Sequence, residues 1–105
     1  MTKINQLTRG QKRRLMYVEN KDGLIDGADA RIGWVRFSKS GQAIYYRGRT
    51  LMKWNRFSSN FADTETGEGY WISGVKKRGS NTHYAYPVTV EIDNDARHEY
   101  QKLMT

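Results

Sequence analysis

The 105-residue sequence contains no cysteine and a single proline, and it has no long run of apolar residues. The absence of cysteine excludes disulfide bonds and thiolate chemistry, and it is compatible with a reducing compartment. No apolar stretch approaches the roughly 20 residues that a membrane-spanning helix needs. The basic N-terminal segment also lacks the apolar centre of a secretion signal. We therefore expect a cytoplasmic protein with no membrane partner.

Motifs of common catalytic, cofactor and metal sites are also absent. The chain has no phosphate-binding P-loop, no dinucleotide fingerprint and no Gly-x-Ser-x-Gly elbow. His83 and His98 are not spaced as metal ligands. A calcium loop starting at Asp22 fails, because Leu24 stands at its third ligand position and Gly33 at its twelfth. From the sequence we assign no catalytic residue, no cofactor and no metal site.

Acidic residues are missing from two long stretches of this basic chain, whose net charge is +7. Residues 1–18 hold five basic side chains and no acidic one, and residues 31–62 hold seven basic side chains and no acidic one. The acidic residues between them gather in 19–30, which includes Asp22, Asp26 and Asp29. Such segregation of charge is typical of a binding face for a polyanion. The alternative is that the lysines and arginines are solvated and only keep a small domain in solution.

The basic stretch 30–54 contains the pattern of a β-hairpin. Two runs of β-branched and aromatic residues flank the segment Ser38-Lys39-Ser40-Gly41. Serine in first place and glycine in fourth predict a type I turn, with Gly41 in the left-handed conformation of a bulge. This register pairs Trp34 with Tyr46, and Arg36 with Ile44. A slip of one residue would exchange the two faces of the hairpin.

The remaining pattern predicts a single mostly β domain over residues 15–105, preceded by a flexible basic arm over 1–14. Further strands are expected at 15–19, 70–73 and 84–92, and residues 49–54 are expected to continue the second hairpin strand. Asp93 is expected to cap a C-terminal helix over 94–103, whose apolar stripe closes one end of a barrel. The expected architecture is a small SH3-like barrel, or a strongly bent antiparallel sheet, with a C-terminal helix.

Several blocks of the chain resemble a family of small uncharacterised bacterial proteins. They are Arg-Ile-Gly from Arg31, Phe-Ser-Lys-Ser-Gly from Phe37, Tyr-Tyr-Arg-Gly-Arg from Tyr45 and Tyr-Trp-Ile-Ser-Gly from Tyr70. The resemblance covers roughly residues 15–102 and leaves out the basic arm. That family has no established activity, so the resemblance implies neither catalytic residues nor a ligand.

Aromatic residues interleaved with arginines predict a surface for RNA or single-stranded DNA, because bases stack on aromatic rings while arginines hold phosphates. The expected nucleic-acid-binding residues are Arg31, Trp34, Arg36, Lys39, Tyr45, Arg47, Arg49, Lys53, Arg56, Lys76, Lys77 and Arg78. Two other functions stay open. One is a protein-interaction or inhibitory module that docks an acidic protein. The other is a small ribonuclease toxin using residues such as Arg47, Arg49, Tyr45, Tyr46, His83 and Glu68.

Within this set, Arg47 and Arg49 are expected to contribute more to binding than the arm. Side chains held on strands lose less entropy on binding than those of a mobile tail. The alternative for these two arginines is a structural role, as ion-pair partners of Asp22, Asp26 or Asp29.

Overall fold

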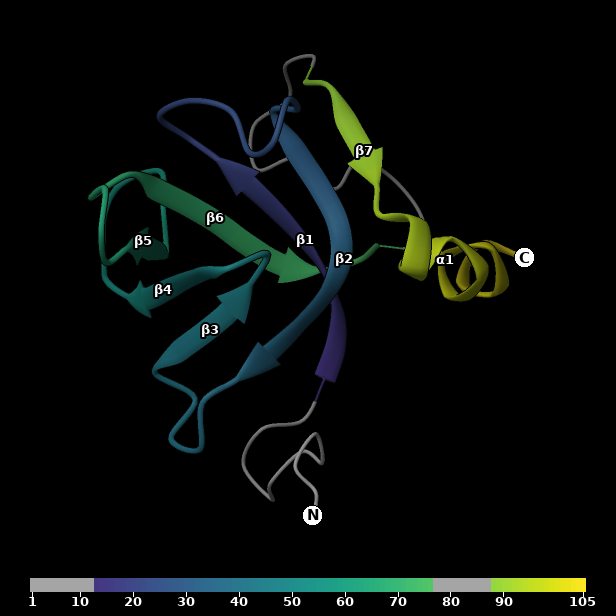
Figure 1. Ribbon diagram of the computed structural model, residues 1–105, viewed down its shortest axis with the longest axis horizontal. Helices are drawn as coiled ribbons and strands as arrows, with labels where there is room; N and C mark the ends of the chain where they lie inside the picture. Colours follow the sequence, from purple (N-terminus) through teal and green to yellow (C-terminus); the bar gives the residue numbers. More distant parts are fainter. Residues whose placement is uncertain (1–12, 77–87) are drawn as a thin grey trace.

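The computed structural model describes residues 13–76 and 88–105, and it confirms a mostly β fold with a short C-terminal helix (Figure 1). Its elements are β1 (Arg13–Asn20), β2 (Ala30–Phe37), β3 (Ala43–Tyr46), β4 (Arg49–Lys53), β5 (Phe61–Asp63), β6 (Gly69–Gly74), β7 (Val90–Ile92), a 3₁₀ turn (Asn94–Ala96) and α1 (Arg97–Met104). The first six strands are antiparallel to their neighbours, in the order β1-β6-β5-β4-β3-β2. Pairing of β1 with β2 closes them into a barrel, the small barrel that the sequence predicts.

The side chains that point into the barrel from each strand are mostly apolar and form its core. Val18, Val35, Ile44, Leu51 and Tyr70 are among its fully buried residues, each contributed by a different strand. Their neighbours along each strand point outward, because successive side chains of a strand face opposite sides of the sheet. A second, smaller cluster forms on the outer face of β1 and β2. Both faces of these two strands are therefore partly buried, as expected of a closed sheet that also carries a helix.

The predicted hairpin of β2 and β3 forms, but its predicted register is wrong by one residue. Arg36 pairs with Tyr45 and Phe37 with Ile44, so the connection has four residues rather than three. The Gly41 amide donates to the Ser38 carbonyl at 2.9 Å and Gly41 has a φ of 79°, which confirms the predicted turn. The Ser38 hydroxyl also accepts the amide of Ala43 at 3.0 Å, which accommodates the extra residue. This shift places Ile44 inside the barrel and Tyr45 outside.

Three strand predictions need correction. β1 begins at Arg13, so the last two residues of the predicted arm belong to the barrel, while residues 1–12 lie outside the described part. Residues 49–53 do not continue β3, because the chain reverses at Arg47-Gly48 and β4 pairs back onto β3. The short strand β5 falls where the sequence analysis expects no strand, since three residues are too few to show the alternation of apolar and polar side chains.

The C-terminal segment docks differently from its prediction. β7 pairs in parallel with the first half of β2, and residues 84–87 of the predicted last strand lie outside the described residues. Asp93 makes no side-chain cap, because its carboxylate turns into the barrel. α1 packs through Tyr100 against the outer cluster of β1 and β2, instead of closing an end of the barrel (Figure 1).

Candidate nucleic-acid interface

A groove opens on the barrel where β2 divides its pairing between two neighbours. The second half of β2 pairs with β3 only at Arg36 and Phe37, and the first half, Ala30 to Ile32, pairs with β7. Between these two ladders, β2 and the β3–β4 turn are not joined by a described pair. The groove is therefore a product of the strand topology.

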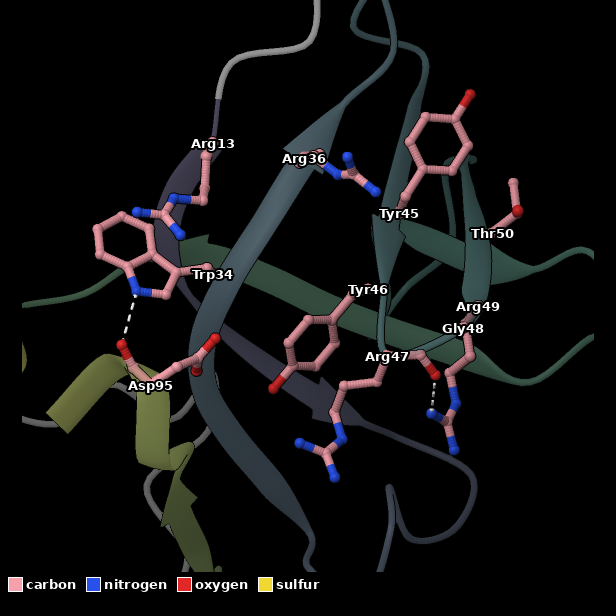
Figure 2. A pocket seen from close by; sticks show the side chains of 10 residues that line it. All are labelled: Arg13, Trp34, Arg36, Tyr45, Tyr46, Arg47, Gly48, Arg49, Thr50 and Asp95. Atoms are coloured by element: carbon pink, nitrogen blue, oxygen red, sulfur yellow. Dashed lines mark hydrogen bonds between the residues drawn. The ribbon is translucent and has the colours of Figure 1, made fainter. Parts of the chain in front are cut away.

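The groove has a volume of about 770 Å³, within the range of pockets that hold small ligands. Figure 2 shows its lining side chains, which come from β1, β2, the β3–β4 hairpin and the turn before α1. They are Arg13, Trp34, Arg36, Tyr45, Tyr46, Arg47, Gly48, Arg49, Thr50 and Asp95. Four arginines and one aspartate among them make the lining cationic.

One wall of the groove is an arginine stacked on a tryptophan. The guanidinium carbon of Arg13 lies 4.2 Å from the ring centroid of Trp34. The indole N–H of Trp34 donates to the Asp95 carbonyl at 3.1 Å, which fixes the ring in its plane. Trp34 is half-buried and Arg13 is exposed, so the stack offers a planar cationic surface to a ligand (Figure 2).

Arg36 and Tyr45 form the next part of the lining, on the paired positions of β2 and β3. Arg36 is exposed and has no ion pair with any carboxylate in the described part of the chain. The half-buried ring of Tyr45 extends away from the barrel interior (Figure 2). An exposed cation, with no counter-charge among the described residues, and an accessible aromatic ring thus lie side by side.

Beneath the groove, the buried carboxylate of Asp93 ties three side chains together. It accepts hydrogen bonds from Arg31 at 3.0 Å, from Tyr46 at 2.5 Å and from Arg47 at 3.2 Å. Burial, and then the hydrogen bond to Asp93, raise the pKa of Tyr46 well above its ordinary value of 10.0. The Tyr46 hydroxyl therefore stays protonated and serves as a hydrogen-bond donor to Asp93.

At the edge of the groove, Asp26 holds two arginines. Arg47 Nε lies 2.6 Å from Asp26 Oδ2, and Arg49 Nη2 lies 2.9 Å from Asp26 Oδ1. The hydrogen bonds from Arg49 and Arg47 lower the pKa of Asp26 well below its ordinary value. The alternative of a structural pairing is thus confirmed for Asp26. Asp22 and Asp29 instead accept the backbone amides of Gly69 and Thr89.

The other predicted binding residues that the structure describes do not line the groove. Arg31 is largely buried against Asp93 and donates to the carbonyls of Ile25 and Asp26. Lys39 is exposed on the β2–β3 connection. Of the remaining predicted cations, Lys53 ends β4, Arg56 follows β4 and Lys76 follows β6. Lys77 and Arg78 lie outside the described residues. Arg56 stacks on Trp54 at 4.5 Å from its ring.

Sequence reasoning assigned Arg13 to the arm and left Tyr46 out of the binding set. Arg13 enters the groove because β1 starts there and its partner on β2 is Arg36. Thr50 and Asp95 carry no signal in the sequence that distinguishes them from other polar residues. The charge pattern could have indicated Arg13, whereas Asp95 reaches the groove only through docking of the C-terminal segment.

Of the residues proposed for ribonuclease chemistry, four line the groove. They are Tyr45, Tyr46, Arg47 and Arg49. Glu68 is bonded to Thr66 outside the groove, and His83 lies outside the described residues.

Comparison of the chain with family models, with curated proteins and with solved structures gives no match. In residues 13–76 and 88–105, no helix is both long and apolar enough to cross a membrane. Over the same ranges, no three histidine, aspartate or glutamate side chains gather as metal ligands would.

Proposed function

We propose that the protein binds single-stranded nucleic acid, RNA or DNA, in the groove between β2 and the β3–β4 hairpin. The observation that carries the proposal is the stack of Arg13 on Trp34 beside the ring of Tyr45 and Arg36, which has no ion pair with a described carboxylate. Bases stack on aromatic rings and on guanidinium planes, while arginines without a counter-charge hold phosphates. A double helix would keep its base faces covered, so this combination favours a single strand.

Two of the four arginines that line the groove are available to a ligand. Arg13 and Arg36 have no ion pair with a described carboxylate, whereas Arg47 is engaged by Asp26 and Asp93. Phosphate contacts by such cations release condensed counterions, so affinity should fall steeply with salt. The Trp34 surface should contribute about 1–3 kcal/mol through stacking.

The test is fluorescence-anisotropy titration of a labelled 12-nucleotide RNA, its DNA equivalent and a duplex, at several salt concentrations. Trp34→Leu should weaken single-strand binding by about 5- to 150-fold, which is the stacking energy expressed as affinity. Arg36→Gln should weaken binding and reduce its salt dependence. Lys39→Gln is the matched control, since it removes one exposed cation from the same hairpin outside the groove.

Equal effects of Arg36→Gln and Lys39→Gln would exclude the groove as the site. No single-strand binding at low salt would refute the function itself. In that case, capture of one acidic protein without nucleic acid would support the interaction-module alternative. A denaturing gel of the incubated RNA checks the ribonuclease alternative, because cleavage yields shorter labelled fragments.

A further inference from the structure

Two tight turns meet at the edge of the groove, and both place a residue other than glycine at positive φ. Asp26-Gly27 forms a two-residue turn closed by hydrogen bonds between Ile25 and Ala28, and Asp26 has a φ of 49°. Arg47-Gly48 joins β3 to β4, and Arg47 has a φ of 46°. Positive φ at both central residues defines a type I′ turn, which favours asparagine, aspartate or glycine at the first of them.

Aspartate suits this position and arginine does not. The left-handed backbone is sterically unfavourable for a residue that carries a β-carbon, such as Arg47. Its side chain compensates by contacting Asp26 at 2.6 Å and Asp93 at 3.2 Å. The arginine at the tip of the β3–β4 turn is thus held there by its interactions with carboxylates.

The carboxylate of Asp26 lies where two guanidinium groups converge. Arg49 contacts both of its oxygens, Oδ1 at 2.9 Å and Oδ2 at 3.3 Å, while Arg47 contacts Oδ2. Arg47 and Arg49 also line the groove, whereas Asp26 does not. The two arginines therefore form a cradle for an oxyanion, and one side of the cradle faces the ligand groove.

The Asp26 side chain remains accessible to water in this cradle. It is 37% exposed, and the side chains of Arg47 and Arg49 are 35% and 24% exposed. Water that reaches an ion pair in this way screens the attraction between its charges. One carboxylate also faces two guanidinium groups, so a positive charge remains for an incoming anion.

We propose that Arg47 and Arg49 form a phosphate subsite of the groove, which the carboxylate of Asp26 occupies until a backbone phosphate of the bound strand displaces it. This inference rests on the proposed binding of single-stranded nucleic acid. A phosphodiester offers two anionic oxygens in place of the carboxylate pair, and arginine binds both groups through parallel hydrogen bonds. Asp26 is then an internal competitor that lowers the affinity of the groove.

The test compares Asp26→Asn with Glu65→Gln, each of which removes one negative charge. Asparagine suits the type I′ turn, so Asp26→Asn changes the charge and preserves the backbone. Glu65 lies on the exposed turn after β5, and its carboxylate has no ion pair with a described residue. In anisotropy titrations with the 12-nucleotide RNA, we expect Asp26→Asn to tighten binding about 3- to 5-fold, as loss of a pair worth up to about 1 kcal/mol implies. Glu65→Gln should change affinity less than 2-fold.

A second comparison separates a local competitor from a general effect of charge. Arg49→Gln is measured in the wild-type chain and in the Asp26→Asn chain. If Asp26 competes for Arg49, loss of this arginine should weaken binding at least 3-fold more in the Asp26→Asn chain. Urea unfolding verifies that each variant folds, and Asp26→Gly, which also suits positive φ, replaces Asp26→Asn if the latter does not fold.

Two results would overturn the subsite: equal gains from Asp26→Asn and Glu65→Gln, or an equal loss from Arg49→Gln in both chains. If binding still depends on Trp34 and Arg36, only the subsite is then refuted. If the wild-type chain binds no single strand, the proposed function itself has failed. Competition by inorganic phosphate as strong as competition by unlabelled RNA would identify a free anion as the ligand of the cradle.

Discussion

Replacement of Asp93 by alanine should destabilise the barrel strongly, although this residue lies outside all six barrel strands. The carboxylate is buried and is the shared acceptor of Arg31, Tyr46 and Arg47. Removing one partner of a buried ion pair costs about 3–5 kcal/mol, because the other charge stays desolvated. Arg31 keeps two carbonyl acceptors and Arg47 keeps Asp26, so we expect the lower end, about 3 kcal/mol.

The measurement is urea unfolding followed by tryptophan fluorescence, with the free energy of unfolding taken by linear extrapolation. For a domain of this size, about 3 kcal/mol corresponds to a fall in Tm of roughly 12–24 °C. Asp95→Ala is the matched control, because it removes an exposed carboxylate two residues along the same segment. We expect this control to change the free energy by less than about 0.5 kcal/mol. If the two variants lose the same small amount, the view that Asp93 anchors the C-terminal segment is refuted.

Two further predictions concern the surroundings of Asp93. Folding raises the pKa of Tyr46 above its ordinary 10.0, so the unfolded chain ionises first and stability should fall as the pH rises above 10. In Tyr46→Phe, the urea midpoint should fall less between pH 9 and pH 10.5 than it does in the wild type. An equal fall in both proteins would contradict the claim that Tyr46 causes the pH dependence. Gly33→Ala should displace the Asp93 carboxylate, because the added Cβ would overlap Asp93 Oδ2 and crowd Tyr46 Oη at 2.8 Å. The double variant Gly33→Ala with Asp93→Ala should then lose clearly less unfolding free energy than the sum of the losses in the two single variants. Full additivity of the two losses would show that the sites are independent.

Local chemistry in the sequence was enough to predict the hairpin, its turn and the fold class. Ser38 and Gly41 specify the turn within four residues, and β-branched and aromatic residues favour the flanking strands. The predicted C-terminal helix is also present, as a 3₁₀ turn followed by α1. These features depend on interactions between near neighbours, which a residue pattern can report.

The register of the hairpin needed the tertiary structure. A connection of three residues and one of four both fit the segment after Ser38, but they place opposite faces of β3 in the core. Closure of the barrel decides between them, because it buries Ile44 and Leu51 together as a cross-strand pair. The outward position of Tyr45, on which the groove depends, follows from that choice.

The arginines illustrate why a charge pattern does not by itself identify a binding residue. The sequence determined that cations are segregated from carboxylates along the chain, and this suggested a polyanion surface. Only the fold brings Asp26 to Arg47 and Arg49, and Asp93 to Arg31, across separations of 21 to 62 residues. Arg36 stays without an ion pair in the described part of the chain, and no property of its own sequence neighbourhood distinguishes it from Arg31. The difference is their position on β2, where successive side chains face opposite sides of the sheet. Arg31 lies on the inner face and meets a buried carboxylate, whereas Arg36 lies on the outer face and lines the groove.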